Sequence, residues 1–261
     1  MTKMRKWNLV VPLSLLFLSG CYTAQAEQPT LEIVSTVPVG REKPKTNFYE
    51  NIQEIKMDEA DSYQVLVNKN FALSSEYAPK DMRLIQVLDT TRNLNLTIKL
   101  RSRAADMIEK LFQAASEDGL ELLAVSGYRS YAHQEDLYNY YVREHGKKEA
   151  DRFSARPGHS EHQTGLAIDV STTSLAGKIE EDFGATPEGL WLVENAARFG
   201  FIIRYPQERE EDTGFMYEPW HLRYVGVSPA NIMGQNNWIF EEYVTKILKV
   251  RLEEKEYKSE F

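Results

Sequence analysis

The chain has 261 residues, of which 42% are hydrophobic and 27% charged, so it carries enough apolar material for one sizeable globular domain. These fractions exclude a collagen, a coiled coil and a low-complexity chain. The formal net charge of −8 disfavours a general nucleic-acid binder, which usually carries a basic patch, and we expect no nucleic-acid partner.

The first 20 residues have the pattern of a secretory signal. Three basic residues within the first six precede an apolar run over 7–18. This run is short for a membrane-spanning helix, which needs about 20 apolar residues. It ends in Leu-Ser-Gly-Cys, which resembles the lipobox of bacterial lipoproteins and predicts lipidation of Cys21. Cys21 is the only cysteine and has no internal disulfide partner. Cleavage after Ala26, which would release a soluble protein, is the alternative.

Residues 21–61 are rich in Glu, Pro, Thr and Lys and predict a flexible tether that begins at the lipidated Cys21. Fully extended, about 40 residues would span on the order of 130 Å. We therefore expect a folded domain over 62–261 that is lipid-anchored to the cell membrane and lies outside it. The run 64–67 is expected to be its first strand.

Helical and extended patterns alternate through the domain. We expect an amphipathic helix over 102–119 that stops at Gly119, and a second helix over 131–146. Thr186 and Ser228 each precede a proline and are expected as N-caps. Strands are expected over 120–127, 201–205 and 221–226. The mixture predicts one compact α+β domain with a central antiparallel sheet flanked by helices. The tail 251–261 is interpreted as a solvated helix end.

A histidine and an aspartate seven positions apart form the first candidate site. His162 precedes an apolar run that contains Asp169, and Gly165 allows a tight turn between them. Catalytic zinc usually has three protein ligands and an open fourth position, and His221 can complete such a set. Taken alone, Asp169 could instead face solvent and His162 could be a surface histidine.

Two further side chains suggest hydrolytic chemistry. Glu218 lies three residues before His221, where a carboxylate can stand beside an activated water as a general base. Arg129 follows an expected strand, and its guanidinium could bind a carboxylate or stabilise an oxyanion. The alternatives are a surface ion pair for Arg129 and a core position for Trp220.

Three stretches in this order identify a resemblance to a known family: SGYRSYAHQ (126–134), SARPGHSEHQTGLAIDV (154–170) and EPWHLRYVG (218–226). Together they resemble the zinc D-Ala-D-Ala carboxypeptidases of the VanY type and the similar LdcB-like L,D-carboxypeptidases of bacterial cell walls. The segment 66–81 also resembles the family's entry segment, and the similarity covers roughly 62–245.

The resemblance implies a role for each motif residue. It assigns one zinc ion per chain to His162, Asp169 and His221, the general base to Glu218, and polarisation of the scissile carbonyl to Arg129. It places Arg129, Gln134 and Ser160 in contact with substrate, and suggests Ser154 and Trp220 as pocket lining. His159 is not a ligand in this family and is interpreted as a loop residue.

The implied activity is removal of the C-terminal D-alanine from peptidoglycan stem peptides during cell-wall remodelling. An L,D-carboxypeptidase that acts on tetrapeptide stems is the alternative, because it shares every motif quoted. A stem-cutting endopeptidase and a non-catalytic peptidoglycan-binding lipoprotein are less favoured, the latter because the whole set of candidate catalytic residues is intact. The expected partners are stem peptides and, through the lipid anchor, the membrane; no protein partner is predicted.

Overall fold

The computed structural model describes residues 61–90 and 97–247, which all belong to one compact unit. The predicted signal segment 1–20, the tether up to residue 60 and the tail 251–261 lie outside the described residues. The named helices and strands are β1 (Met82–Leu84), β2 (Lys99–Arg101), α1 (Ser102–Glu117), β3 (Leu122–Ser126), α2 (Tyr131–His145), α3 (Lys147–Phe153), β4 (Ala167–Thr172), α4 (Pro187–Asn195), β5 (Phe201–Tyr205), α5 (Glu210–Thr213), β6 (Glu218–Tyr224) and α6 (Val227–Asn236).

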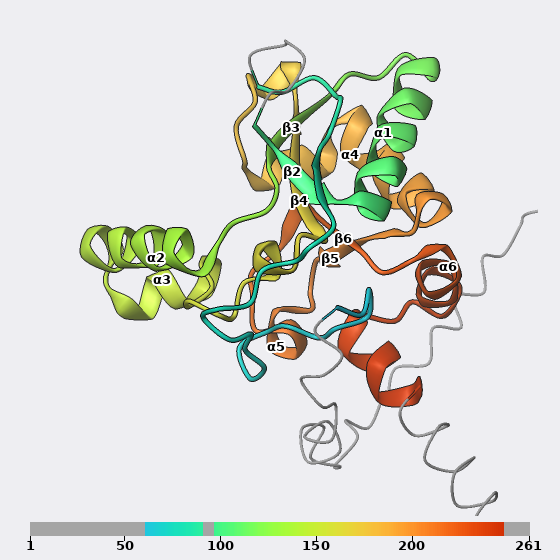
Figure 1. Ribbon diagram of the computed structural model, residues 1–261. Coiled ribbons are helices and arrows are strands. Elements are labelled where there is room, and N and C mark those ends of the chain that lie inside the picture. Colours follow the sequence, from blue (N-terminus) through green and yellow to red (C-terminus); the bar gives the residue numbers. More distant parts are fainter. Residues whose placement is uncertain (1–60, 91–96, 248–261) are drawn as a thin grey trace, which may run out of the picture. The chain divides into compact units, whose positions relative to one another are not determined.

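Four antiparallel strands form the central sheet in the order β3-β4-β6-β5, and β1 and β2 form a separate two-stranded ribbon (Figure 1). The pairing of β3 with β4 and that of β5 with β6 each contain a register shift, the local irregularity by which a sheet re-aims side chains. The predicted class, an α+β domain with a central antiparallel sheet and flanking helices, is confirmed.

One face of the sheet is covered by helices. The buried side chains of α1, including Ile108 and Leu111, recur at helical spacing and pack in the same cluster as Leu192 of α4. Ile168 of β4 and Leu222 of β6 belong to this cluster. Figure 1 shows α1 and α4 on the same side of the strands. This face is therefore the main apolar core.

Side chains alternate along β4 and β6, so those next to the core residues point to the other face of the sheet. Ile168 is paired with Leu222, and the next pair along the two strands is Asp169 with His221. Because successive side chains of a strand point to opposite faces, the pair that follows a core pair must lie on the face away from α1. An ionisable aspartate thus occurs in the apolar run of β4 without entering the apolar core.

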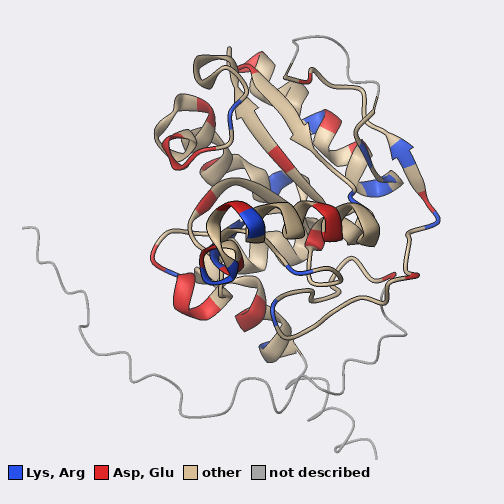
Figure 2. Cartoon of the chain, turned by 90° about the vertical axis from the view of Figure 1, so that its left-hand side faces the viewer, with Lys and Arg blue, Asp and Glu red and all other residues tan. Residues whose placement is uncertain are grey.

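A second cluster lies towards the C-terminal end of the domain. It joins Leu66 of the entry segment, Met233 of α6 and Phe240 of the helical residues 240–247. The α2–α3 pair projects at the left in Figure 1 and faces the viewer in Figure 2, where it carries both acidic and basic positions.

Most expected elements are confirmed, with small shifts at their ends. The helix expected over 102–119 is α1, which ends before Gly119 with φ +80°, and Thr186 caps α4 by accepting a hydrogen bond from the Gly189 amide. Strand β6 begins at Glu218, three residues before the expected start.

Two expectations are wrong. Residues 64–67 form no strand, because the Val65 carbonyl accepts a hydrogen bond from the Arg223 guanidinium and no neighbouring strand pairs with this segment. Ser228 is not an N-cap: α6 begins at Val227 with Gly226 in the cap position, so the serine lies within the first turn. Among the described residues, no helix has both the length and the apolar character needed to span a membrane.

Candidate active site

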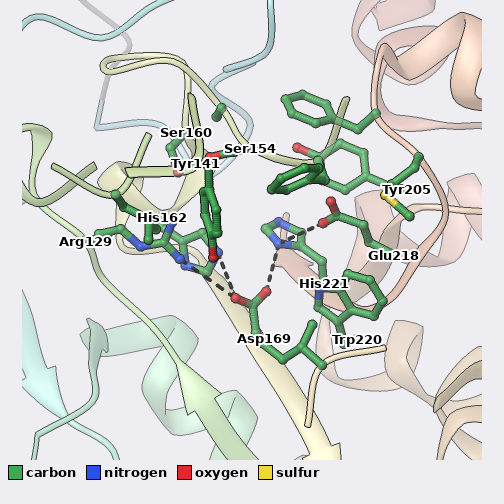
Figure 3. Close-up of a pocket in the computed structure, with 16 residues that line it drawn as sticks. Arg129, Tyr141, Ser154, Ser160, His162, Asp169, Tyr205, Glu218, Trp220 and His221 are labelled. Carbon is green, nitrogen blue, oxygen red and sulfur yellow. Dashed lines mark hydrogen bonds and ion pairs between the residues drawn. The ribbon is translucent and has the colours of Figure 1, made fainter. Parts of the chain in front are cut away.

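Two histidines and an aspartate meet on the face of the sheet away from α1. The carboxylate of Asp169 lies 3.2 Å from Nε2 of His162 and 3.0 Å from Nδ1 of His221 (Figure 3). The three candidate ligand atoms lie within 4.8 Å of one another, and all three side chains are buried. Tetrahedral zinc with ligands at about 2.0–2.2 Å holds them about 3.3 Å apart, so this donor set fits zinc.

The local structure explains how the chain brings these ligands together. His162 lies on a 3-10 turn, η2 (Glu161–Thr164), which ends at Gly165 with φ +67°, and β4 begins two residues later. A positive φ suits glycine, so the chain can reverse here without strain. Asp169 and His221 are directly opposite across β4 and β6. Side chains in such cross-strand pairs are close neighbours.

Hydrogen bonds orient both imidazoles for metal binding. Nδ1 of His162 lies 2.7 Å from the Gly127 carbonyl, which can only accept, so Nδ1 carries the proton and Nε2 is free to ligate. Nε2 of His221 lies 3.3 Å from the carboxylate of Glu161, which leaves Nδ1 directed at Asp169. Second hydrogen bonds of this kind fix the tautomer and orientation of metal-ligating histidines.

The protonation states follow from burial and from these contacts, and without a metal they differ between the two histidines. Burial lowers the pKa of His162, which favours the neutral ligand. Burial acts on His221 in the same direction, but hydrogen bonds to Asp169 and Glu161 outweigh it and raise the pKa of His221 to about 9. Burial alone would raise the pKa of Asp169, but the two imidazoles hold that pKa well below its usual range. Asp169 is therefore a carboxylate, as a ligand must be.

Glu161 belongs to a buried network of two carboxylates and two guanidinium groups. Its Oε1 accepts from Nε of Arg204 at 2.8 Å and from Nη1 of Arg223 at 2.7 Å. Arg204 also donates to both oxygens of Glu241, at 2.9 and 2.5 Å. Burial opposes ionisation of Glu161, but the two arginines hold its pKa well below its usual range. The charges sum to zero, so the network can hold a fixed carboxylate behind His221.

Glu218 stands beside the three ligands. Its Oε2 lies 4.0 Å from Nδ1 of His221, and the side chain is almost fully buried. Burial and the nearby carboxylates of Asp169 and Glu161 raise the pKa of Glu218 to about 8. A bound cation would lower this pKa, because it favours the charged form. A buried glutamate whose pKa is brought near 7 is suited to accept and return a proton.

Arg129 is held at the edge of the site by two hydrogen bonds. Nη1 donates to Oε1 of Gln134 at 2.7 Å, and Nη2 donates to Oγ of Ser126 at 3.2 Å and lies 3.9 Å from Asp169. The amide nitrogen of Gln134 donates to the Ala155 carbonyl at 2.7 Å. Both ends of this amide are engaged, and Gln134 does not line the cavity. The structure thus places Gln134 behind Arg129, whose guanidinium it contacts, and the contact of Gln134 with substrate stays a prediction.

A cavity of about 370 Å³ opens over these groups. Its walls include nearly all of the predicted site residues: Arg129, Ser154, Ser160, His162, Asp169, Glu218, Trp220 and His221. Cavities of this size accept small ligands, and these walls combine apolar surface with a few convergent polar groups. His159 lies outside this cavity, in a loop, with Nδ1 2.8 Å from the Asn68 carbonyl.

Several side chains of the site were not anticipated. The ring of Tyr205 lies 5.0 Å from that of His221, and Tyr141, Phe153 and Phe215 add aromatic walls to the cavity. Glu161 is part of the motif around His162, and its position in the sequence does not indicate that it contacts His221, 60 residues away. These contacts depend on how β5, β6 and α2 are placed in space.

The antiparallel sheet and the turn η2 before β4 together present two imidazoles, one carboxylate and a separate buried glutamate. This arrangement defines the class of a metal-dependent hydrolase. Residues 97–227 match the family described as VanY, D-alanyl-D-alanine carboxypeptidase. The chain belongs to this family.

Two relatives illustrate the extent of the similarity. YodJ of Bacillus subtilis (strain 168), named as an inferred carboxypeptidase, is 37% identical over 233 residues, covering 87% of this chain and 85% of that protein. A D-alanyl-D-alanine carboxypeptidase of Enterococcus faecalis (strain ATCC 700802 / V583) is 33% identical over 212 residues, covering 78% of this chain and 73% of that protein. The resemblance seen in the motifs is thus confirmed over most of both chains.

Solved structures show the same fold. The LdcB LD-carboxypeptidase has a TM-score of 0.67 and 42% identity, with 71% of this chain and 86% of that chain covered. A variant of the D,D-pentapeptidase VanY from a VanB-type vancomycin-resistance cassette, in complex with Zn(II), has a TM-score of 0.57 and 31% identity, with 70% and 98% covered. The first is an L,D-carboxypeptidase and the second a D,D-peptidase, and both resemble this chain.

Proposed function

We propose that the protein is a zinc-dependent D-alanyl-D-alanine carboxypeptidase that removes the terminal D-alanine from peptidoglycan stem peptides. One observation carries the proposal: His162, Asp169 and His221 converge within 4.8 Å of one another on a cavity that Glu218 and Arg129 also line. Membership of the VanY family supports the same reaction.

His162 would hold zinc through Nε2 and His221 through Nδ1, with Asp169 as the third ligand and one ion per chain. When bound, zinc supplies Lewis acidity, which polarises the scissile carbonyl and makes water a better nucleophile at neutral pH. The three buried side chains fix the position at which this chemistry takes place.

Glu218 would act as the proton carrier. Its carboxylate accepts a proton from the attacking water and later returns it to the departing amine of D-alanine. Arg129 stabilises the negative charge that develops on the carbonyl oxygen, since Gln134 and Ser126 hold its guanidinium at the edge of the site. Ser154, Ser160 and Trp220 line the remaining walls, where they would position the peptide.

The replacement Glu218→Gln tests this mechanism on the full-length chain. We expect hydrolysis to fall by about 10²–10⁴-fold, because the amide cannot accept the proton, while one zinc per chain is retained. Glu194→Gln, which removes an exposed carboxylate of α4, is the matched control and should keep full activity. Full activity of Glu218→Gln, or a chain that binds no zinc, would refute the mechanism.

A second candidate activity is L,D-carboxypeptidase action on tetrapeptide stems. The LdcB LD-carboxypeptidase supports it, with a higher identity and TM-score than the VanY structure. Incubation with pentapeptide and tetrapeptide stems, followed by mass spectrometry, separates the two. Loss of one alanine from the pentapeptide alone supports the D,D activity, and loss from the tetrapeptide alone supports the L,D activity. Release from neither would favour a non-catalytic peptidoglycan-binding protein.

We further propose that the enzyme is exported and anchored by a lipid on Cys21, with its domain facing the cell wall. The charged and apolar pattern of the first 20 residues and the Leu-Ser-Gly-Cys sequence support this location. Labelled fatty acid should enter the intact protein and not the Cys21→Ala variant, and only the former should sediment with membranes. Equal sedimentation without label would contradict the anchor.

A further inference from the structure

A second cavity, of about 180 Å³, adjoins the active-site cavity. We call it the Lys69 pocket; it is lined by Lys69, Asp151, Ser154, Ala155, Arg156 and His159. Ser154 and Ala155 also line the active-site cavity, so they form a wall common to both. A peptide bound at the candidate zinc ligands could therefore extend across these two residues into the Lys69 pocket.

The Lys69 pocket carries an excess of positive charge. The one carboxylate in its lining, Asp151, accepts hydrogen bonds from Arg156 at 3.0 and 2.8 Å and from the Tyr138 hydroxyl at 2.7 Å. These contacts hold the pKa of Asp151 down to about 2. Within the described part of the chain, no carboxylate lies at ion-pair distance from Lys69. Its ammonium is thus available to an anion from outside.

Lys69 is an exposed residue, but neighbouring groups hold its side chain in place. Its Nζ donates to the backbone carbonyl of Asp151 and lies 4.4 Å from the ring centroid of Phe215, which lines the active-site cavity. A Cβ placed on Gly214 would lie 3.0 Å from Cδ of Lys69, so the alkyl chain packs against this glycine. An ammonium has three donors, and two remain for a ligand after the bond to Asp151. Fixing such a group beforehand lowers the entropy cost of binding.

We propose that the Lys69 pocket binds a carboxylate of the stem peptide while the scissile bond lies at His162, Asp169 and His221. The inference rests on the proposed function and adds a second recognition site to it. The carboxylate is either the terminal one or a free carboxylate on the N-terminal side of the cleaved bond. Partial burial lowers the pKa of Lys69, and a carboxylate beside the ammonium would oppose this shift.

Three peptides distinguish the two carboxylates. The first is diacetyl-L-Lys-D-Ala-D-Ala, whose only carboxylate is terminal. The second is a pentapeptide stem with a free α-carboxylate on its second residue, D-isoglutamate, and the third is the same pentapeptide with that carboxylate amidated. Binding is measured by calorimetry on the full-length, zinc-loaded chain carrying Glu218→Gln, in which hydrolysis is suppressed. KM and kcat are measured on the chain with Glu218 intact.

Two variants test the charge of Lys69: Lys69→Met keeps the length of the side chain and removes the charge, and Lys69→Arg keeps a positive charge. Lys110→Met is the matched control on the exposed face of α1. If the pocket binds the second-residue carboxylate, Lys69→Met weakens binding of the free pentapeptide about tenfold and leaves the other two peptides unchanged. If it binds the terminal carboxylate, all three weaken alike. In either case KM rises, kcat is retained, and Lys69→Arg restores most of the loss.

The inference is overturned if Lys69→Met binds all three peptides within twofold of the parent chain, or if Lys110→Met has an equal effect. The free and amidated pentapeptides can also be compared on the chain without a Lys69 substitution; equal affinity for them there eliminates the second-residue carboxylate. Failure of every peptide to be hydrolysed would refute the proposed function, whereas the calorimetric comparison would still decide whether the pocket binds a carboxylate.

Discussion

The replacement Glu161→Gln tests whether a buried carboxylate behind the zinc ligands is needed to orient His221. Glutamine has the same shape, but one end of its amide is a donor. If that end faces His221, it meets Nε2–H, and if it faces the other way, it meets the guanidinium groups of Arg204 and Arg223. Either orientation loses hydrogen bonds and leaves the buried network with one excess positive charge.

The size of the effect follows from these contacts. Removing one partner of a buried ion pair costs about 3–5 kcal/mol, and because the amide keeps one acceptor we expect about 3 kcal/mol less stability. Loss of the hydrogen bond that orients a metal-ligating histidine typically lowers metal affinity by about 10–100-fold. Glu161→Gln should therefore show both losses.

Glu241→Gln is the matched control. It removes an equally buried carboxylate from the same Arg204, and no contact of Glu241 with His221 is seen among the described residues. We expect a similar loss of stability, about 3 kcal/mol by urea unfolding of the metal-free protein at pH 7, with zinc affinity unchanged. Zinc affinity is read by competition with a chromophoric chelator. Equal loss of affinity in both variants, or none in Glu161→Gln, would refute the orienting role.

Three other outcomes follow from single contacts. Because Arg156 holds the pKa of Asp151 down to about 2, Asp151→Asn should lower the free energy of unfolding by about 1 kcal/mol at pH 7, a figure that allows for solvent exposure of the pair. This deficit should shrink between pH 4 and 2, where Asp151 becomes protonated in the parent chain. A constant deficit in urea unfolding across this pH range would contradict the prediction. Since the pKa of His221 is raised to about 9, zinc binding at pH 7 should release about one proton from this residue and should tighten as the pH approaches 9. Calorimetry in buffers of different ionisation enthalpy, on the Glu218→Gln chain so that Glu218 contributes no proton, measures this release, and zero release would count against it. Gly165→Ala should destabilise the protein by about 2 kcal/mol, and Gly119→Ala by about 1 kcal/mol. Both glycines have positive φ, but a Cβ at position 165 would lie 2.7 Å from Sδ of Met82, whereas a Cβ at position 119 would have no atom within 4 Å. Equal melting temperatures of the two variants would refute the packing argument.

Local patterns in the sequence were sufficient for much of the fold and for the candidate ligands. The apolar spacing of α1, the proline after Thr186 and the β-branched run of β5 depend on neighbouring residues only, and each element forms where expected. His162 and Asp169 were paired because a short glycine turn separates them. His221, Glu218 and Arg129 needed the family motifs as well, because their proximity depends on the sheet.

The remaining features depend on distant partners. The run 64–67 has strand-like composition, yet its Val65 carbonyl accepts a hydrogen bond from the side chain of Arg223 and no neighbouring strand pairs with it. The spacing of Gln134 does not show that its amide is hydrogen-bonded to Arg129 and to the Ala155 carbonyl. Tertiary packing determines which hydrogen-bond partner each of these groups has, and the local sequence pattern does not indicate it.

Both ends of the described domain contact the buried network of arginines and glutamates behind His221. Arg223 donates to the carbonyls of Tyr63 and Val65, Asn68 donates to Glu241, and Glu241 lies on the helical residues 240–247. The family match spans only 97–227, so a fragment cut to those limits would lose the entry segment and that helix together. Arg204 would then lose Glu241 and Arg223 would lose the two backbone carbonyls, so that Glu161 would be left to pair with both arginines. A catalytic fragment should therefore extend from about residue 62 to at least residue 247, because shortening it from either end removes partners of this buried network and lowers the stability of the domain.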